Sequence, residues 1–148
     1  MDEPSAFPIH EFRTQRRVEF ADTDMGGIVH FSRFFVFMET AEHDFLRALG
    51  AEVHMTLNEQ DIGWPRVEAS CQYLSPAKLA DELEIHLRVI RKGNKSMTYG
   101  MTFSCNDTIV ARGRMSSVCC VMNDAVGLQA IPIPSVIADR IAPPPEIA

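Results

Sequence analysis

The amino-acid sequence contains no long apolar segment. Its apolar runs, such as Phe34 to Met38, are far shorter than the roughly 20 residues that a helix needs to cross a bilayer. The N-terminus, Met1 to Ser5, is acidic and lacks the basic and then apolar order of a secretory signal. We therefore expect no membrane span, and we predict a cytoplasmic protein.

Patterns typical of metal and redox sites are also missing. The four cysteines, Cys71, Cys105, Cys119 and Cys120, show neither C-x-x-C spacing nor the density of a disulfide scaffold. The five histidines show no metal-ligand spacing. We expect reduced cysteines, no metal and no cofactor. The chain also lacks an excess of positive charge, and its net charge of -6 argues against general nucleic-acid binding.

The sequence has 148 residues, enough for one domain that buries its own core. No internal repeat divides it. We predict a single domain over residues 1–148, with a core from about 16 to 141. Short irregular tails flank this core, and the C-terminal tail is rich in proline.

A long amphipathic helix is predicted from about Ser32 to Leu49. Its apolar residues recur at intervals of three or four and form one stripe: Phe34, Met38, Ala41, Phe45 and Leu49. Ser32 is predicted to cap the first turn through its hydroxyl, and Gly50 to end the helix.

Alternating apolar and polar residues then predict a series of half-buried strands. The apolar faces are Val67, Ala69, Cys71 and Tyr73, then Leu83, Ile85, Leu87 and Val89, then Met97, Tyr99, Met101 and Phe103. A hairpin turn is predicted at 92–95, with Gly93 and Asn94 where positive φ is tolerated, and another turn at 106–107. A last long strand is predicted from Thr108 to Met122.

One long helix followed by a meander of antiparallel strands predicts an α+β fold in which the curved sheet wraps around the helix. Exposed strand edges in such a sheet invite pairing between subunits. We therefore expect a homodimer or a homotetramer.

Asp22 and Asp24 stand with two glycines directly before the predicted helix. A short strand at 17–20 is predicted to lead into them, so that Asp24 lies on the connecting loop, where its carboxylate can face a ligand. From the residues alone, a plain polar turn rich in Asp and Gly is the favoured interpretation.

This region resembles the 4-hydroxybenzoyl-CoA thioesterase family. The resemblance rests on Phe-Ala-Asp-Thr-Asp-Met-Gly-Gly-Ile-Val-His-Phe at 20–31 and Ser-Arg-Phe-Phe-Val-Phe-Met-Glu at 32–39. It extends to the strand order, to Gly63-Trp64-Pro65 and to Ile131-Pro132, and covers about Arg16 to Ile141. The resemblance implies a hotdog fold and an enzyme that hydrolyses an acyl-CoA thioester to a free acid and coenzyme A.

The resemblance also assigns catalytic roles. Asp24 matches the family's acidic catalytic residue, as nucleophile or as general base acting on water. Phe31 matches the residue whose backbone N–H binds the thioester oxygen. Asp22 resembles a supporting residue that makes turn hydrogen bonds, while Gly26 and Gly27 permit a close backbone approach.

Substrate-binding roles follow for residues further along the chain. His30 and Glu39 are candidate substrate contacts, with a structural histidine and a helix ion pair between Glu39 and His43 as the alternatives. Trp64 lines the acyl pocket or fills the core. At the predicted 92–95 hairpin, a basic cluster matches the residues that meet the coenzyme A phosphates in the family: Arg91, Lys92 and Lys95.

Two other functions stay open. A hotdog hydratase or dehydratase would use His30 and Asp24 as a proton-transfer pair. A non-catalytic acyl-CoA-binding module would have the same fold without the hydrolytic activity. The acyl group, whether aromatic, short or long, is not defined by the sequence.

Overall fold

The computed structural model describes residues 6–123, 125 and 127–146. In chain order its elements are β1 (Glu11–Arg17), the 3-10 helix η1 (Phe20–Asp22), α1 (Arg33–Ala48), β2 (Met55–Leu57), β3 (Gln60–Gly63), β4 (Arg66–Tyr73), β5 (Glu82–Lys92), β6 (Ser96–Cys105), β7 (Thr108–Val118), β8 (Cys120–Asn123), β9 (Gly127–Ala130) and α2 (Ser135–Ala138). Across these ranges, no helix is long and apolar enough to span a membrane.

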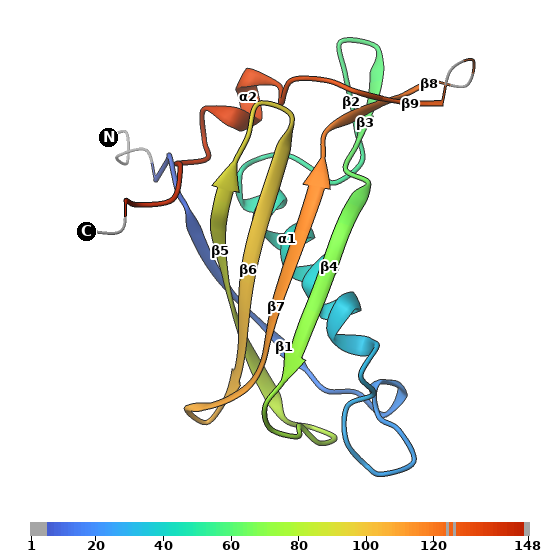
Figure 1. Ribbon diagram of the computed structural model, residues 1–148, viewed down its shortest axis with the longest axis vertical. Helices are drawn as coiled ribbons and strands as arrows, with labels where there is room; N and C mark the ends of the chain where they lie inside the picture. Colours follow the sequence, from blue (N-terminus) through green and yellow to red (C-terminus); the bar gives the residue numbers. More distant parts are fainter. Residues whose placement is uncertain (1–5, 124, 126, 147–148) are drawn as a thin grey trace.

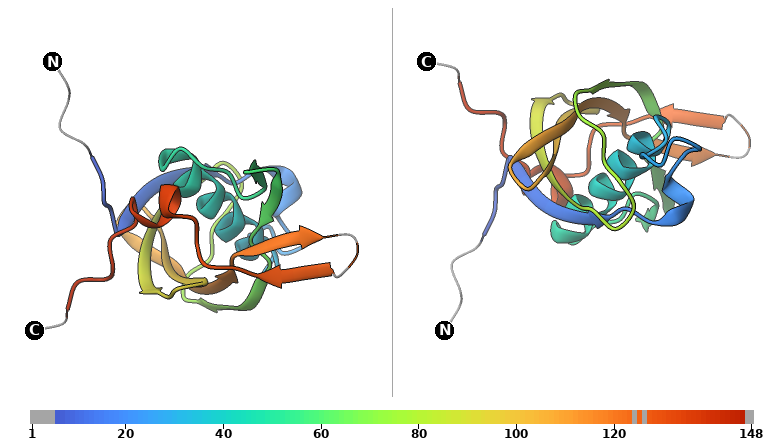
Figure 2. Two further views of the ribbon diagram at one scale, coloured as in Figure 1. Left: turned by 90° about the horizontal axis from the view of Figure 1, so that it is seen from above. Right: turned by 90° about the horizontal axis from the view of Figure 1, so that it is seen from below.

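The main sheet has five antiparallel strands in the order β1-β5-β6-β7-β4. It curls around α1, which lies on its concave side (Figure 1, Figure 2). β1 and β4 form the two edges of this sheet. The arrangement confirms the predicted α+β fold, in which a curved antiparallel sheet wraps around one long helix.

A second sheet was not predicted. It has four strands in the order β2-β3-β8-β9, and β3 pairs with β8. The β8–β9 hairpin extends away from the body of the molecule (Figure 2). Its strands are short and largely exposed, so they carry little of the alternating pattern by which the longer strands were recognised.

The helix α1 forms because its apolar residues fall on a face that the sheet covers. Its buried apolar residues include the predicted stripe: Phe34, Phe37, Met38, Ala41, Phe45 and Leu46 within the helix, and Leu49 directly after it. Burial of each large side chain contributes about 1.5–3 kcal/mol. Gly50 then ends the helix with left-handed backbone at a φ of 81°. The predicted helix is therefore confirmed.

β5 and β6 supply the other side of the core. Their alternate apolar residues are buried as predicted: Leu83, Ile85, Leu87, Val89, Met97, Tyr99, Met101 and Phe103. Edge-to-face ring contacts join the helix to β6, with centroids 5.4 Å apart for Phe34 and Phe103 and 5.7 Å apart for Phe45 and Tyr99.

The segment before α1 differs from its prediction. β1 ends at Arg17, so the strand predicted at 17–20 is wrong, and η1 occupies Phe20–Asp22. The turn forms because the Asp22 carboxylate accepts a hydrogen bond from the Glu19 N–H, which an extended strand would not allow. The predicted Ser32 cap is also wrong. Ser32 already has helical backbone angles, and its hydroxyl contacts His30 Nδ1 at 2.8 Å.

β4 is less covered than predicted. Val67 is 65% exposed and Tyr73 48% exposed, although both belong to the face predicted to be buried. Ala69 is exposed as well, and Cys71 is half-buried. β4 is an edge strand that pairs only with β7, and a bulge between Arg66 and Glu68 shifts its register. The outcome is an apolar surface along one edge of the sheet.

Two turns and the last strand also differ in detail. The hairpin at 92–95 forms, but neither Gly93 nor Asn94 has a positive φ. Positive φ occurs instead at Asn106 and Asp107, in the predicted turn between β6 and β7. The strand predicted from Thr108 to Met122 is divided at Cys119, whose N–H donates to the Lys95 carbonyl and whose carbonyl accepts from Ile131.

Gly113 of β7 faces α1 without room for a side chain, because a Cβ there would lie 2.3 Å from Met38 Sδ. We predict that Gly113→Ala lowers the free energy of unfolding by about 1–3 kcal/mol, since the methionine must shift. The loss should shrink in a Met38→Ala background, which a double-mutant cycle in urea measures. Equal losses in both backgrounds would contradict this explanation.

Candidate active site

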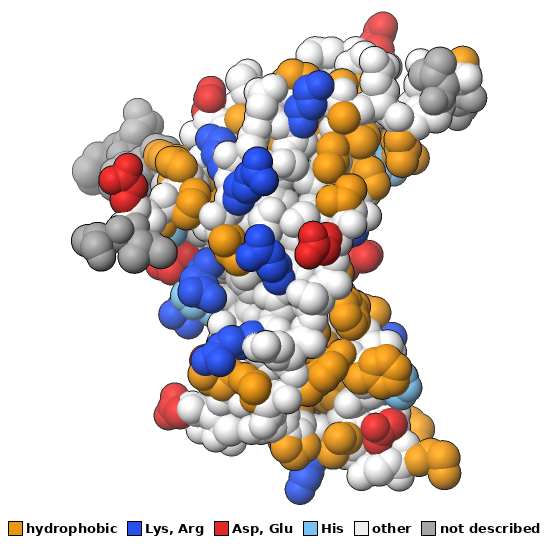
Figure 3. Space-filling model, in the orientation of Figure 1, with side chains coloured by type: hydrophobic (Ala, Val, Ile, Leu, Met, Phe, Trp, Pro, Cys, Tyr) orange, Lys and Arg blue, Asp and Glu red, His pale blue; other side chains and the backbone are white. Residues whose placement is uncertain are grey.

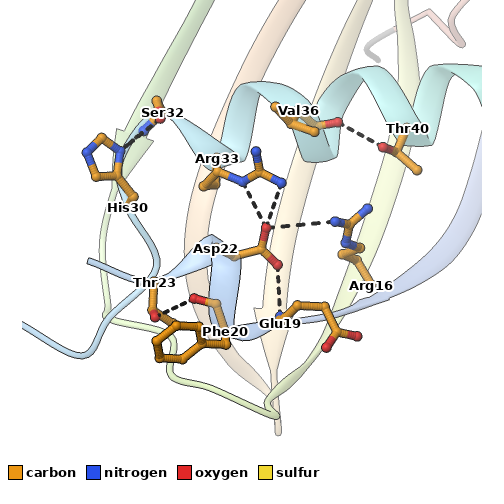
Figure 4. A network of polar contacts seen from close by, with 10 residues as sticks. All are labelled: Arg16, Glu19, Phe20, Asp22, Thr23, His30, Ser32, Arg33, Val36 and Thr40. Atoms are coloured by element: carbon orange, nitrogen blue, oxygen red, sulfur yellow. Dashed lines mark hydrogen bonds and ion pairs between the residues drawn. The ribbon is translucent and has the colours of Figure 1, made fainter. Parts of the chain in front are cut away.

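Asp22 anchors the loop that precedes α1. Its side chain is 1% exposed. Oδ1 accepts hydrogen bonds from Arg33 Nε and Nη2, each at 2.8 Å, and lies 3.8 Å from Arg16 Nη2 (Figure 4). Oδ2 accepts from the Glu19 N–H at 2.8 Å. The expected turn hydrogen bond is therefore present, and both Asp22 oxygens are occupied by contacts within the protein.

Asp24 lies on a tight turn with one carboxylate oxygen held in place. Its Oδ1 accepts from the Gly26 N–H at 2.8 Å and makes a longer contact of 3.4 Å with the Ile28 N–H. Gly27 has a φ of 82°, and a Cβ on Gly26 would lie 3.2 Å from Asp24 Oδ1. The glycines thus permit a turn that few other residues would accept. Oδ2 has no hydrogen-bond partner within the described chain.

Phe31 ends this loop at the start of α1. Its ring is 63% exposed, and its carbonyl accepts a hydrogen bond of 2.8 Å from the Tyr73 hydroxyl of β4. Among the described residues, none accepts a hydrogen bond from the Phe31 N–H. A backbone donor near the positive end of the α1 dipole is therefore available to a ligand.

His30 contacts Ser32 through its Nδ1 atom. The Ser32 N–H donates to His30 Nδ1 at 3.2 Å, a contact that in a neutral ring favours the tautomer with its proton on Nε2. The imidazole also stacks on the Phe31 ring, with centroids 4.6 Å apart. Nε2–H forms no hydrogen bond with the described residues and remains available as a donor.

A groove of about 450 Å³ opens beside Asp24. Its walls come from the Asp24 loop, α1, the end of β4 and the turn after it: Asp24, Ile28, Val29, Phe31, Phe34, Tyr73, Leu74, Ser75, Pro76 and Ala77. Asp24 and Phe31 also border a second, more open hollow of about 800 Å³ together with His30. The structure therefore brings Asp24, Phe31 and His30 together beside a largely apolar wall.

Glu39 and Trp64 lie outside this groove. Glu39 is exposed on α1 and approaches His43 Nε2 at 3.7 Å, in the alternative ion-pair arrangement. The two residues line a separate polar hollow with Arg66. Trp64 is 2% exposed and belongs to the core cluster, in agreement with its alternative interpretation as a core residue.

The basic hairpin lies at the opposite end of the subunit from the Asp24 loop (Figure 1). Arg91 and Lys95 are exposed. Lys92 is half-buried instead, and its ammonium donates to the carbonyls of Ala138 and Ile141, each at 2.7 Å. Lys92 therefore anchors the segment around Ala138 and Ile141 to the end of β5.

Some residues that shape the site were not singled out from the sequence. Arg33 and Arg16 position Asp22, and Tyr73 fixes the Phe31 carbonyl. The only sequence signal for Tyr73 was its place on the apolar face of a strand. Within the described chain, no cluster of three or more His, Cys, Asp or Glu side chains is arranged to hold a metal ion.

Glu42 of α1 forms a further polar cluster inside the core, with Arg66 and Ser117. It is fully buried, and its carboxylate accepts from Arg66 Nη2 at 2.8 Å and from the Ser117 hydroxyl at 2.9 Å. Burial raises the pKa of Glu42 to about 7 against the opposing effects of Arg66 and Ser117.

Comparison with known proteins identifies the family. The family model of the Thioesterase-like superfamily matches residues 18–141. The chain belongs to this superfamily. The acyl-CoA thioesterase YbgC of Haemophilus influenzae is 25% identical over 119 residues, which cover 80% of this chain and 82% of the relative. The predicted thioester hydrolase class is thereby confirmed.

Solved structures of this superfamily share the architecture. The gentisyl-coenzyme A thioesterase BH1999 superposes with a TM-score of 0.77 at 30% identity, covering 88% of this chain and all of its own. A mutant of 4-hydroxybenzoyl CoA thioesterase, complexed with 4-hydroxybenzoyl CoA, gives a TM-score of 0.77 at 20% identity and covers 90% and 99% of the two chains. These superpositions confirm the hotdog fold. The comparisons favour neither the hydratase nor the binding module.

The Glu42 cluster predicts a pH effect on the stability of this thioesterase. Because the folded state holds the Glu42 proton up to about pH 7 while the ordinary pKa is 4.5, the free energy of unfolding should fall as pH rises between these values. This fall amounts to about 3 kcal/mol over the whole range, and Glu42→Gln should abolish it. Urea denaturation from pH 4.5 to 8 measures it, with exposed Glu68→Gln as the control. An unchanged slope in Glu42→Gln would contradict the prediction.

Proposed function

We propose that this protein is an acyl-CoA thioesterase in which Asp24 acts on the thioester carbonyl. The observation that carries the proposal is that Asp24 and Phe31 line one groove and that each has a group without a partner in the described chain, namely Asp24 Oδ2 and the Phe31 N–H. An apolar wall for the acyl group completes the arrangement. The acyl-CoA activity of the named relatives agrees with it.

Asp24 is suited to this role because the Gly26 N–H orients its carboxylate without occupying both oxygens. Oδ2 can attack the carbonyl carbon, expel the coenzyme A thiolate and leave an acyl anhydride that water hydrolyses. Alternatively, Oδ2 takes a proton from the water that attacks. Both routes use the same oxygen and give a free acid and coenzyme A.

The negative charge that develops on the thioester oxygen requires a hydrogen-bond donor. We assign this role to the Phe31 N–H, which lies near the start of α1, where the helix dipole favours negative charge. Tyr73 holds the Phe31 carbonyl and thereby limits rotation of the adjoining backbone. His30 contributes Nε2–H as a substrate contact.

We further propose that the enzyme acts as a homodimer paired through β4. β4 is an edge strand with exposed apolar side chains, whereas the other edge, β1, exposes mainly charged and polar ones. Pairing of β4 with the same strand of a second copy would be antiparallel about a two-fold axis. The Arg66 end of one strand would then lie beside the Tyr73 end of the other.

This dimer would give Glu39 and the hairpin their predicted roles. The polar hollow of Glu39, His43 and Arg66 would meet the groove of the other subunit, where it can contact the far end of the acyl group. Arg91 and Lys95 would likewise reach the coenzyme A phosphates from a second subunit, since they lie far from their own Asp24 loop. A tetramer and a cytoplasmic location stay predictions, and the acyl group is undefined.

Asp24→Asn should lower kcat by about 100-fold to 10,000-fold, because it removes the nucleophile or base but retains the turn hydrogen bonds. Release of free thiol from a panel of acyl-CoA thioesters measures the rate. Asp107→Asn, on an exposed turn, is the matched control and should retain full activity. The assignment fails if Asp24→Asn keeps the wild-type rate, or if no acyl-CoA in the panel is hydrolysed.

Val67→Lys should convert the dimer into monomers, since the two-fold axis places two added charges in one interface. Light scattering after gel filtration measures the mass, and hydrolysis should fall with dissociation. Val136→Lys, an exposed position on α2, is the control. A Val67→Lys protein with unchanged mass would refute pairing through β4.

A further inference from the structure

The β8–β9 hairpin exposes apolar side chains that the proposed function does not use. Met122 of β8 and Leu128 of β9 are directly paired in register, so both project from the same face of the hairpin. They are 48% and 55% exposed, and they line a hollow of about 240 Å³. Asp124 is the only charged residue in the sequence from 120 to 130. The two paired side chains therefore form an apolar surface with little charge around it.

The β8–β9 hairpin lies at the end of β4 that is farther from the groove of its own subunit. β8 pairs with β3, which ends at Gly63, and β4 begins shortly afterwards at Arg66. The groove beside Asp24 is at the other end of β4, where Tyr73 lines it. These two ends are about 23 Å apart, at about 3.3 Å per residue. Since β8 and β9 have only four residues each, the hairpin does not reach its own groove.

Pairing of two subunits through β4 changes this relation. In the antiparallel pair about a two-fold axis, the Arg66 end of one strand lies beside the Tyr73 end of the other, at a spacing of about 4.8 Å. The β8–β9 hairpin also projects past β4, on the side where the second copy would pair (Figure 1, Figure 2). The groove of the partner subunit is then the surface that lies next to Met122 and Leu128.

The surface around the groove is itself apolar and exposed. Phe31 and Leu74 are exposed along the groove, and Phe20 and Met25 are exposed in the more open hollow that Phe31 also lines. Hydrophobic side chains gather toward both ends of the β4 side of the molecule (Figure 3). Exposed apolar surfaces of this kind indicate a contact. A membrane fits less well than a second copy, because the two-fold axis places the two grooves at opposite ends of the dimer.

We propose that the β8–β9 hairpin of one subunit covers the groove of its partner and selects acyl groups with an extended apolar end. This inference rests on the proposed thioesterase function and on pairing through β4. Met122 and Leu128 would contact the part of the acyl group that projects beyond Phe31, and would exclude water from it. Each buried methylene group contributes about fourfold to affinity, so a long acyl group gains from this cover and an acetyl group does not.

Met122→Ser combined with Leu128→Ser should lower kcat/KM for octanoyl-CoA about tenfold and change kcat/KM for acetyl-CoA less than twofold. Release of free thiol measures both rates, and light scattering should show an unchanged mass. Val136→Ser, at an exposed apolar position of α2, is the matched control. An equal loss for both substrates, no loss for either, or dissociation of the assembly would overturn the proposal. A wild type that prefers acetyl-CoA to octanoyl-CoA would also contradict it.

Hybrid dimers show which groove each hairpin serves. In the first hybrid, one subunit carries Asp24→Asn and the other carries the hairpin double variant. Its single intact groove faces a wild-type hairpin, so kcat/KM for octanoyl-CoA should return to about half of the wild-type value per dimer. In the second hybrid, one subunit carries all three changes and its partner is wild type. Its intact groove faces the variant hairpin, so the tenfold loss should remain. The reverse pattern would assign each hairpin to its own groove.

If wild type hydrolyses no acyl-CoA, the proposed function fails, and photo-crosslinking still decides the inference. Leu128→p-benzoylphenylalanine should link two chains on irradiation, and mass spectrometry should locate the link in residues 20–31 or 73–79 of the second chain. The same photoreactive residue at position 136 is the control and should give no such link. Links confined to one chain, or links elsewhere on the second chain, would refute the covering role of the β8–β9 hairpin.

Discussion

The ion pair between buried Asp22 and half-buried Arg33 is the constraint on which the geometry of the site depends. Two guanidinium N–H groups of Arg33, in the first turn of α1, converge on one oxygen of Asp22, while the other oxygen holds the Glu19 N–H. The loop is thereby fastened to the helix at one end and to the end of β1 at the other. Asp24 and Phe31 lie between these points, so neither can move far relative to α1.

The same constraint explains why two similar carboxylates differ in their surroundings. Asp22 is buried and has partners for both oxygens, so removing it would leave the half-buried Arg33 without its partner and loosen the turn. Asp24 is half-exposed, and one oxygen has no partner among the described residues. The free oxygen is retained because Gly26 and Gly27 allow the backbone to hold the carboxylate from one side only.

The sequence predicted the parts of the fold whose side chains obey a regular period. α1, β5 and β6 show such periods and are buried as predicted, because the core covers them along their length. Prediction failed where tertiary position overrides the pattern. The Val67 to Tyr73 face alternates like a buried strand, yet it lies at an edge of the sheet that α1 covers only in part. At the site, the motif predicted Asp24 and Phe31, while Arg33 and Tyr73 act through contacts distant in sequence, which no local pattern encodes.

The exposed apolar edge and the groove are two aspects of one surface. Phe31, Tyr73 and Leu74 are exposed around the groove that Asp24 faces, and Val67 continues the apolar surface along β4. A carboxylate acts on a thioester most effectively when water is excluded, because a low dielectric strengthens its interaction with the carbonyl. In a single subunit the groove is open to solvent along β4. A second subunit on this edge would both bury the apolar side chains and close the groove, so assembly and catalysis would depend on the same residues.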